Sequence, residues 1–448
     1  MLLMISELGR PAGRREHTGV RTMSTPMPGK LPRGAAFWLL AAVFGMLMFA
    51  SAAPSPLYVV YQQHWHFSAL ALTAVYAANA VALLVTLLFA GSLSDHLGRR
   101  PVLLGAVAVE LASMVVFAEA RSLGWLFAGR IVQGIATGAA TGALSASLID
   151  LQPAGSRLGA LMTNVAAAGG IAVGALATGL LVEYGPAPTR LVFWLLTAVF
   201  AVALPLIALM PEPVVPDGGW LRSLRPEVAV PAEVRAPFAA LLPSIVATWA
   251  LGGLYLSLGG SLMHAVLHLN SHLAGALVIV SLQGTSAVVA LLARDWSVRR
   301  SLLVGPVALL AGVVLALVAL RAGSAWLFFA ASVLAGVGFG PSFSGALRTL
   351  TTLAPAARRA EVVTAVYVLS YLALSLPAVA AGIAVAHIGL SATATWYGVS
   401  VCVLEALALL AGLRRGEPAT AVPVPSLLPI PGPGTAAPCP RVLAAQHR

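Results

Sequence analysis

Apolar residues fill most of the chain in long runs that alternate with short polar turns. Twelve of these runs come close to, or exceed, the roughly 20 residues that a helix needs to cross the hydrocarbon layer of a membrane. They cover residues 35–60, 70–90, 102–119, 123–147, 158–183, 190–210, 238–263, 273–293, 302–320, 325–348, 360–386 and 392–413. The pattern predicts an all-α membrane protein with twelve transmembrane helices.

Composition supports this prediction and limits the partners. Of the 448 residues, 59% are hydrophobic and 9% are charged, whereas about 25% of a soluble domain is charged. The net charge of +11 does not indicate nucleic-acid binding, because the arginines lie in turns and not on a face with stacking aromatic residues. The two cysteines, Cys402 and Cys439, fit no zinc or redox motif. We therefore expect a lipid bilayer as surroundings, with no metal and no cofactor.

The basic residues are divided unequally between alternate turns. Counting the tails, 22 of the 26 Lys and Arg residues fall on one side, and only Arg121, Arg190 and Arg321 fall on the other. Arg130 lies inside the fourth apolar run. Positive residues favour the cytoplasmic side. This division predicts that both termini are cytoplasmic and that the protein lies in the cell membrane, plasma or inner.

An internal repeat appears when the sequence is shifted by 200 residues. DHLGRRPVLLG at 95–105 then lies over DWSVRRSLLVG at 295–305, and at nearly the same offset QPAGSR at 152–157 lies over APAARR at 354–359. Two halves in the same orientation are a recurrent transporter architecture. The repeat predicts five parts: an N-terminal tail (1–34), a six-helix bundle (35–210), a linker (211–237), a second six-helix bundle (238–414) and a Pro/Ala-rich tail (415–448). Both tails are predicted to be disordered and cytoplasmic.

Two motifs in the first half carry a family resemblance. GSLSDHLGRRPVLL, which begins at Gly91, resembles the G-x-L-x-D-x-x-G-R-R-x-x-L signature of the major facilitator superfamily. AGRIVQGIATGAATG, at 128–142, resembles the R-x-x-Q-G signature of the fourth helix of that family. The resemblance covers about 35–414 and implies a secondary transporter that works as a monomer by alternating access, similar to drug and metabolite exporters.

The first motif is predicted to form a cytoplasmic gate. Its glycines allow a tight turn, and the family places its aspartate against the positive start of the eleventh helix. The two arginines of the motif can reach an acid at the end of the fourth helix, while two more arginines begin the eleventh. The predicted gate comprises Gly91, Asp95, Gly98, Arg99, Arg100, Asp150, Arg358 and Arg359. The alternative is that these arginines only follow the positive-inside rule.

The second motif places a charge in the membrane interior. Arg130 lies about 10 Å from the start of its helix, where an unpaired charge is costly, so it must face a cavity or a partner. Glu110, in the third helix, is the nearest carboxyl group by depth. We expect Arg130, Gln133, Gly134 and Glu110 to couple transport to a proton gradient or to bind substrate.

Two prolines, Pro54 and Pro56, interrupt the first helix, and backbone groups freed there must face protein or a cavity. We expect a mostly apolar cavity with a few polar anchors. Its candidate residues are Tyr58, Gln62, Tyr255, Gln283, Ser342, Tyr367 and Tyr371. The sequence contains no Walker loop, H-E-x-x-H or G-x-S-x-G motif, so an enzyme is not expected. The prediction is proton-coupled export of a small, largely apolar molecule. The first alternative is import of a metabolite, and the less favoured one is a receptor that does not transport.

Overall fold

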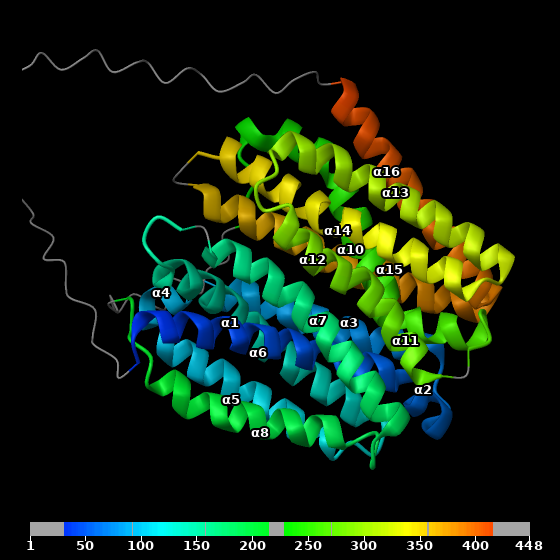
Figure 1. Ribbon diagram of the computed structural model, residues 1–448, viewed down its shortest axis with the longest axis horizontal. Coiled ribbons are helices and arrows are strands. Elements are labelled where there is room, and N and C mark those ends of the chain that lie inside the picture. Colours follow the sequence, from blue (N-terminus) through cyan, green and yellow to red (C-terminus); the bar gives the residue numbers. More distant parts are fainter. Residues whose placement is uncertain are drawn as a thin grey trace, which may run out of the picture.

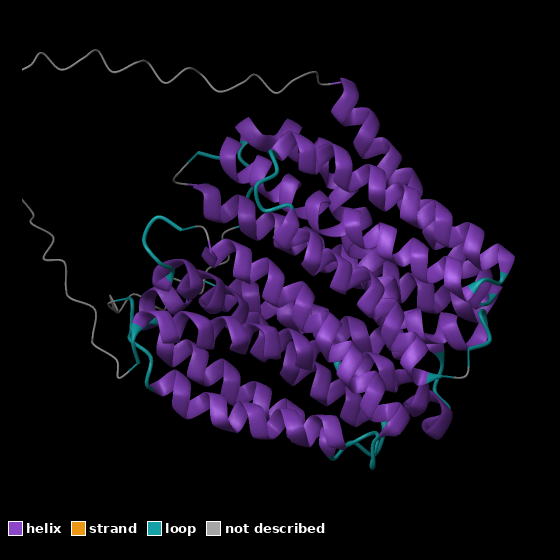
Figure 2. Cartoon of the chain, viewed as in Figure 1, coloured by secondary structure: helices purple, strands orange, loops and turns teal. Residues whose placement is uncertain are grey.

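The computed structural model describes residues 31–91, 93–156, 158–214, 228–269, 271–355 and 358–414. Within these ranges the regular structure is helical, with no strand (Figure 2). The first group of helices is α1 (Arg33–Ala52), α2 (Pro54–Trp65), α3 (Ala69–Ala90), α4 (Leu93–Leu97), α5 (Arg99–Ala118), α6 (Leu123–Leu151), α7 (Leu158–Tyr184) and α8 (Leu191–Ala208). The second is α10 (Ala232–Ala265), α11 (His272–Ile279), the π-helix η1 (Val280–Gly284), α12 (Thr285–Leu292), α13 (Val298–Ala322), α14 (Ala325–Leu353), α15 (Arg359–Ile388) and α16 (Leu390–Arg414).

Twelve helical segments of the described chain are long and apolar enough to cross a membrane, which confirms the predicted fold class. The first segment combines α1 and α2, and the eighth combines α11, η1 and α12. The predicted N-terminal tail lies outside the described residues except for 31–34. Residues 215–227 of the predicted linker and the predicted C-terminal tail lie wholly outside them. At the other end of that linker, α10 begins at Ala232 rather than at 238, because Val234 is fully buried in an apolar cluster with residues of α14 and α15, among them Leu350 and Val362.

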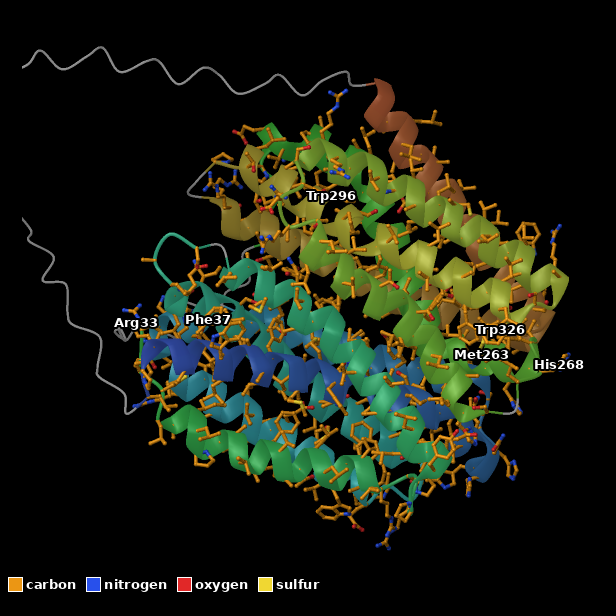
Figure 3. All side chains as sticks on the ribbon, in the orientation of Figure 1. Arg33, Phe37, Met263, His268, Trp296 and Trp326 are labelled. Atoms are coloured by element: carbon orange, nitrogen blue, oxygen red, sulfur yellow. The ribbon has the colours of Figure 1, made fainter. Side chains whose placement is uncertain are left out.

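The helices form two groups that lie side by side, α1–α8 and α10–α16 (Figure 1). In this view α5 and α8 lie on the outer flank of the first group, and α13 and α16 lie on the outer flank of the second. Arg33 marks one end of the molecule, whereas His268 and Trp326 lie at the opposite end (Figure 3). These are called the Arg33 end and the His268 end below.

The two groups meet along α3, α7, α11, η1, α12 and α15, with α3 packed on α15 and α7 packed on α11 and α12. Inside the first group, close approach of α6 to α3 depends on two glycines. A Cβ at Gly134 would lie 2.7 Å from the Ala82 Cβ, and one at Gly138 would lie 2.9 Å from the Thr86 Cβ. The small residues of the second motif therefore serve helix packing.

Large apolar side chains cover the outside of both groups. Five exposed tryptophans lie near the beginnings of helices, namely Trp38, Trp125, Trp194, Trp326 and Trp396. Tryptophan prefers the boundary between lipid and water. A surface with apolar flanks and tryptophans at the helix ends is that of a multi-pass membrane protein.

Candidate functional site

A buried arginine lies at the centre of the first group. Arg130 is fully buried on α6. Its Nε donates to the Tyr58 hydroxyl at 2.8 Å, and its Nη1 donates to the Ser51 carbonyl oxygen at 2.8 Å and to Gln133 Oε1 at 2.7 Å. The rings of Tyr58, Tyr76 and Phe117 surround the guanidinium at 5.5–5.9 Å. The charge is thus held by dipoles and aromatic faces.

The break in the first transmembrane segment explains why side chains of α6 bond to the carbonyl oxygens of Ala50 and Ser51. α1 ends at Ala52 and α2 begins at Pro54, as the prolines predict. Proline has no N–H, so Pro54 cannot donate to the carbonyl of Ala50 four residues earlier. Gln133 Nε2 donates to that oxygen at 2.9 Å, and Arg130 satisfies the next carbonyl, of Ser51. Side chains of α6 therefore replace hydrogen bonds that the broken helix has lost.

Glu110 joins this cluster through Gln133. Gln133 Nε2 donates to Glu110 Oε1 at 3.3 Å, while Glu110 Oε2 has no hydrogen-bond partner in the described structure. Within the described residues no ion pair links Glu110 to Arg130; the interaction that the sequence predicts is relayed by the amide of Gln133. Tyr58, Glu110, Arg130 and Gln133, with the carbonyls of Ala50 and Ser51, are called the Arg130 network below.

A cavity of about 190 Å³ lies next to the network, between the two groups of helices. Ser51 and Tyr76 line it and also contact Arg130. None of the described residues that line it is charged or a histidine. The polar lining side chains are Ser51, Asn79, Thr137, Thr141, Ser145, Thr163, Asn164, Gln283 and Ser286, and the aromatic ones are Phe44, Tyr76, Trp249, Phe339, Phe343, Tyr367 and Tyr371.

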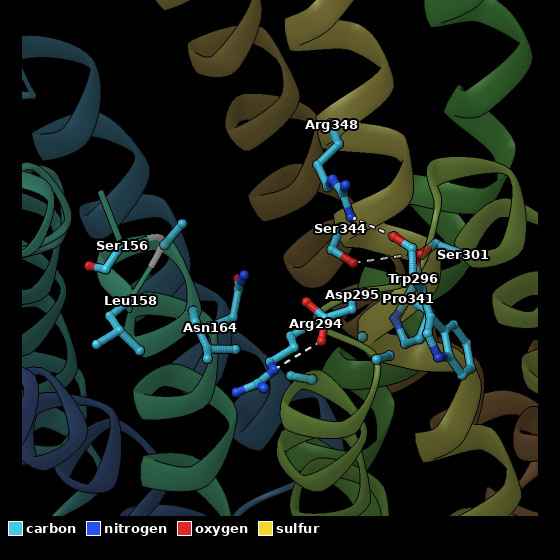
Figure 4. A pocket seen from close by; sticks show the side chains of 15 residues that line it. Ser156, Leu158, Asn164, Arg294, Asp295, Trp296, Ser301, Pro341, Ser344 and Arg348 are labelled. Atoms are coloured by element: carbon cyan, nitrogen blue, oxygen red, sulfur yellow. Dashed lines mark hydrogen bonds and ion pairs between the residues drawn. The ribbon is translucent and has the colours of Figure 1, made fainter. Parts of the chain in front are cut away.

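A second cavity, of about 620 Å³, is drawn in Figure 4. It lies nearer the Arg33 end, because its lining residue Ser156 follows closely on Asp150, whose carbonyl oxygen accepts from Arg33. Ser156, Leu158 and Asn164 line it from the first group, and residues 290–296 with α14 line it from the second. Arg294 pairs with Asp295 at 3.2 Å, and Arg348 Nη1 donates to the Trp296 carbonyl oxygen at 3.2 Å. Asn164 and Gly340 line both cavities, so the larger cavity adjoins the central one.

Three of the predicted gate residues are joined at the Arg33 end. Arg99 pairs with Asp95 at 2.5 Å and with Asp150 at 3.3 Å. Arg100 does not reach Asp150 but donates to the Ala208 carbonyl oxygen at 3.4 Å. Gly91 packs against α6, where a Cβ at Gly142 would lie 3.0 Å from the Gly91 carbonyl oxygen.

The arginines that begin the eleventh transmembrane segment lie apart from this cluster. Arg358 pairs with Glu361 at 2.7 Å, and Arg359 is exposed. In this conformation the described contacts of Asp95 remain within the first group. Among the described residues, none of these contacts joins the predicted gate residues of one group to those of the other.

Glu212, which the sequence reading missed, organises the start of α5. Its two carboxylate oxygens accept from the backbone N–H groups of Arg99 and Arg100, each at 2.8 Å. Gly98 adopts φ +99°, and a Cβ there would lie 2.9 Å from Glu212 Oε2. A carboxylate at a helix N-terminus is favourable. The sequence feature that could have indicated this cap is the single acid in the PEP segment after the sixth apolar run.

A similar cap joins the two groups near the His268 end. Glu183, at the end of α7, accepts from the backbone N–H groups of His272 and Leu273 at 2.8 and 3.4 Å. These residues begin α11, in the other group. The groups are thus in contact at this end and separated by a cavity at the other.

The predicted cavity residues divide into two sets. Gln283, Tyr367 and Tyr371 line the central cavity. Tyr58 belongs to the Arg130 network, Gln62 donates to the Phe67 carbonyl oxygen at 3.5 Å, and Tyr255 bonds with Ser332 at 2.9 Å. Ser342 is buried against Gly305. These four do not line the cavity, because the rotation of each helix sets the face on which a side chain lies, and span boundaries do not determine it.

Other cavity residues were missed, among them Asn79, Thr137 and Trp249. Asn79 is a lone amide in the second apolar run, and Thr137 lies on the helix face of Arg130 and Gln133, four residues after Gln133. A search for isolated polar residues inside apolar runs would have found both.

An all-helical membrane protein with two pseudo-repeated groups of six transmembrane segments and a cavity between them belongs to the class of secondary transporters. The sequence model of the Major Facilitator Superfamily matches residues 38–378. The chain belongs to this family.

Two curated relatives match part of the chain. A uridine/deoxyuridine transporter of Lactococcus lactis subsp. cremoris (strain MG1363) is 33% identical over 178 residues, 38% of this chain and 35% of its own length. Citrate exporter 1 of Aspergillus niger is 34% identical over 137 residues, 29% of this chain and 25% of its own. The chain therefore matches about a third or less of either relative.

Solved structures share the fold at low sequence identity. The nucleoside transporter NupG has a TM-score of 0.66 at 13% identity, covering 85% of this chain and 100% of that one. A POT family transporter in complex with 5-aminolevulinic acid has a TM-score of 0.66 at 14% identity, covering 87% and 99%. These similarities concern the fold alone.

Proposed function

We propose that this protein is a secondary active transporter that exports a small, uncharged and largely apolar molecule in exchange for protons. The observation that carries the proposal is the uncharged cavity shared by the two groups of helices. The larger cavity adjoins it on the side of the Arg33 end, while Glu183 and α11 join the groups near the other end. Alternating access requires such a site between two bodies that can rock about it.

The Arg33 end is the cytoplasmic end in this proposal. The turns and tails assigned to that side together carry 22 basic residues against three on the other, and positive residues are retained in the cytoplasm. The conformation described above is then an inward-open one in a cell membrane. Among the relatives, one is named a transporter of uridine and deoxyuridine and another an exporter of citrate, so the direction of transport must be measured.

The Arg130 network provides the proton coupling. Arg130 stays charged at any working pH, whereas Glu110 can exchange a proton. A charged Glu110 holds the amide of Gln133, and Gln133 also holds Arg130 and the Ala50 carbonyl. Arg130 in turn bonds the carbonyl of Ser51, which lines the cavity. Protonation of Glu110 weakens the first of these contacts, and the change reaches the cavity through the break in the first segment.

The test uses everted and right-side-out vesicles with an imposed proton gradient. Wild type should accumulate substrate in everted vesicles when their lumen is acidic. Glu110→Gln should respond to the gradient at least tenfold less while retaining exchange of substrate. Glu405→Gln is the matched control, because Glu405 is also a fully buried glutamate but bonds Ser244 in the other group.

Three results would count against this proposal. A normal gradient response in Glu110→Gln rules out Glu110 as the coupling acid. An equal loss in Glu405→Gln indicates a general effect of removing a buried carboxyl. Accumulation only in right-side-out vesicles establishes import in place of export.

A further inference from the structure

The central cavity carries polar groups that the fold leaves unpartnered. Asn79 Oδ1, Thr137 Oγ1, Trp249 Nε1 and Gln283 Oε1 are buried atoms of lining residues with no hydrogen-bond partner in the described structure. Two of them come from each group of helices. Buried polar groups are nearly always satisfied in proteins, by protein, water or a ligand. Their gathering around one cavity indicates an occupant that forms hydrogen bonds.

The amides of Asn79 and Gln283 lie one residue away from exact correspondence in the two halves. Gly134 of α6 packs against Asn79 on α3, and Gly336 of α14 packs against Leu282, beside Gln283. The two glycines are 202 residues apart and the two amides 204 apart, close to the 200-residue offset of the repeat. Each half thus presents one side-chain amide to the same cavity.

Gln283 lies in the one π-helical turn of the described chain, η1, between α11 and α12. A π turn adds one residue to a helix, which rotates the following residues by about 100° relative to an unbroken α-helix. Such turns recur at functional sites. This local irregularity is a second feature, independent of the unpartnered atoms, that marks the Gln283 wall of the cavity as a binding surface.

Aromatic rings form a further part of the lining, contributed by the second group. Trp249 contacts Phe343 and Tyr371 with ring centroids 5.2 Å apart in both cases, at interplanar angles of 75° and 64°. Tyr367 extends this cluster, with its ring 6.4 Å from that of Tyr371. Ring faces and edges of this kind favour a flat ring in the occupant.

Charge decides between a flat neutral ring and a cation. An aromatic cage also suits quaternary ammonium groups, but no described lining residue carries negative charge. The guanidinium of Arg130 bonds Ser51 and lies 5.8 Å from the ring of Tyr76, and both residues line the cavity. This positive neighbour repels cations.

We infer that the substrate is a small, uncharged, planar heterocycle whose edge carries both a hydrogen-bond donor and an acceptor, as a lactam or imide does. The side-chain amides of Asn79 and Gln283 match such an edge with paired donor and acceptor atoms, in the way that amides bind base edges, and the Trp249 cluster receives its face. The central cavity, of about 190 Å³, has room for a small ring system, since sites for drug-sized molecules span roughly 300–1,000 Å³. This inference rests on the proposed function for the identity of the cavity as the transport site.

Binding to the purified full-length protein tests the inference without any gradient. The probes are uracil and its riboside as lactam heterocycles, 1,3-dimethyluracil as the ring without donors, toluene as the apolar ring, and benzyltrimethylammonium as the cation. Titration calorimetry should detect the lactam probes, and methylation should weaken binding by about 5- to 150-fold, the range expected for one paired hydrogen-bonding edge. The free base and the riboside distinguish a bare heterocycle from its sugar conjugate.

Variants assign the binding to the two amides. Asn79→Ala and Gln283→Ala should each weaken uracil binding by a factor in the same range, and Trp249→Ala should weaken uracil and dimethyluracil alike. Gln62→Ala is the matched control, because Gln62 is an amide at the end of α2 that does not line the cavity. Asn79→Ser, which keeps a polar group beside Gly134, serves if Asn79→Ala does not fold.

The outcomes separate this inference from the proposed function. Equal or tighter binding of toluene or the cation overturns the inference, as does unchanged uracil binding in both amide variants. Lactam binding that depends on the amides, with no transport of the bound probe in vesicles, upholds the inference about the cavity and overturns the transport proposal. Gradient-driven transport of toluene-like molecules alone upholds the transport proposal and overturns the inference about the cavity.

Discussion

Gln133 is the residue through which the Arg130 network is connected, and replacing it is the sharpest perturbation of the site. Gln133→Leu shortens the side chain by one atom and removes every polar atom. It leaves the Ala50 carbonyl, one Arg130 N–H and Glu110 Oε1 without their present partner. The helix break then loses the donor that replaces the missing N–H of Pro54.

The expected cost follows from these three contacts. A hydrogen bond to a charged group contributes about 1.5–3 kcal/mol and a neutral one about 0.5–1.5 kcal/mol. Counting the 2.7 Å bond to Arg130 as charged, the 2.9 Å bond to Ala50 as neutral, and neglecting the 3.3 Å contact to Glu110, Gln133→Leu should lower the free energy of unfolding by about 2–4.5 kcal/mol.

The measurement is unfolding in mixed detergent micelles, for the single variants and in a cycle with Glu110→Gln. Because Gln133 bonds Glu110, the two changes should be non-additive by about 0.5–3 kcal/mol. Gln62→Ala should cost less than about 0.5 kcal/mol. A cost below about 1 kcal/mol for Gln133→Leu, or strict additivity with Glu110→Gln, would refute the relay through Gln133.

Three further changes test other parts of the structure. Gly98→Ala should lower the free energy of unfolding by about 1–2 kcal/mol, because φ +99° disfavours a side chain and the new Cβ lies 2.9 Å from Glu212. Thermal unfolding measures this, and Gly105→Ala, inside α5 with nothing within 4 Å, should not lower the free energy of unfolding. Glu183→Gln should weaken the contact with α11 and shift the ratio of molecules open to molecules closed at the His268 end by about two- to thirtyfold toward the open ones. Spin-label distances between positions 125 and 326 measure this ratio. Unchanged distances, or the same shift in Glu119→Gln, argue against the prediction. With Cys402 and Cys439 replaced, cysteines placed at Ser68 and Ser156 should label from opposite sides of intact cells; labelling of both from outside contradicts twelve spans.

The number and approximate limits of the transmembrane segments could be predicted from the sequence, because the length of an apolar run is a direct measure of its ability to cross a bilayer. The break at Pro54 was predictable for a similar reason, since proline removes a donor wherever it stands. The largest error in a helix start was that of α10. Charged residues at 233 and 235 looked like linker, although buried Val234 between them packs on α14 and α15.

The site was harder to predict because it depends on helix rotation and on contacts between distant segments. The sequence offers Glu110 and Arg130 as partners by depth alone, whereas their link runs through Gln133, whose role depends on the faces of α5 and α6. Glu212 lies 113 residues from the Arg99 amide that it caps. No local pattern reports such a distance. Gln283 was predicted from its residue type alone, because the π turn that contains it leaves no signature in the periodicity of apolar residues.

The hydrogen bond from Gln133 to the Ala50 carbonyl at the helix break restricts which substitutions this sequence can tolerate. A residue with an N–H at position 54 would satisfy the Ala50 oxygen from within its own helix, and Gln133 would then lose one of its three contacts. Conversely, loss of the amide at 133 makes Pro54 costly, because the oxygen is then buried with no donor. Positions 54 and 133 are thus expected to covary among relatives: replacement of either one by itself is selected against, and replacement of both is tolerated.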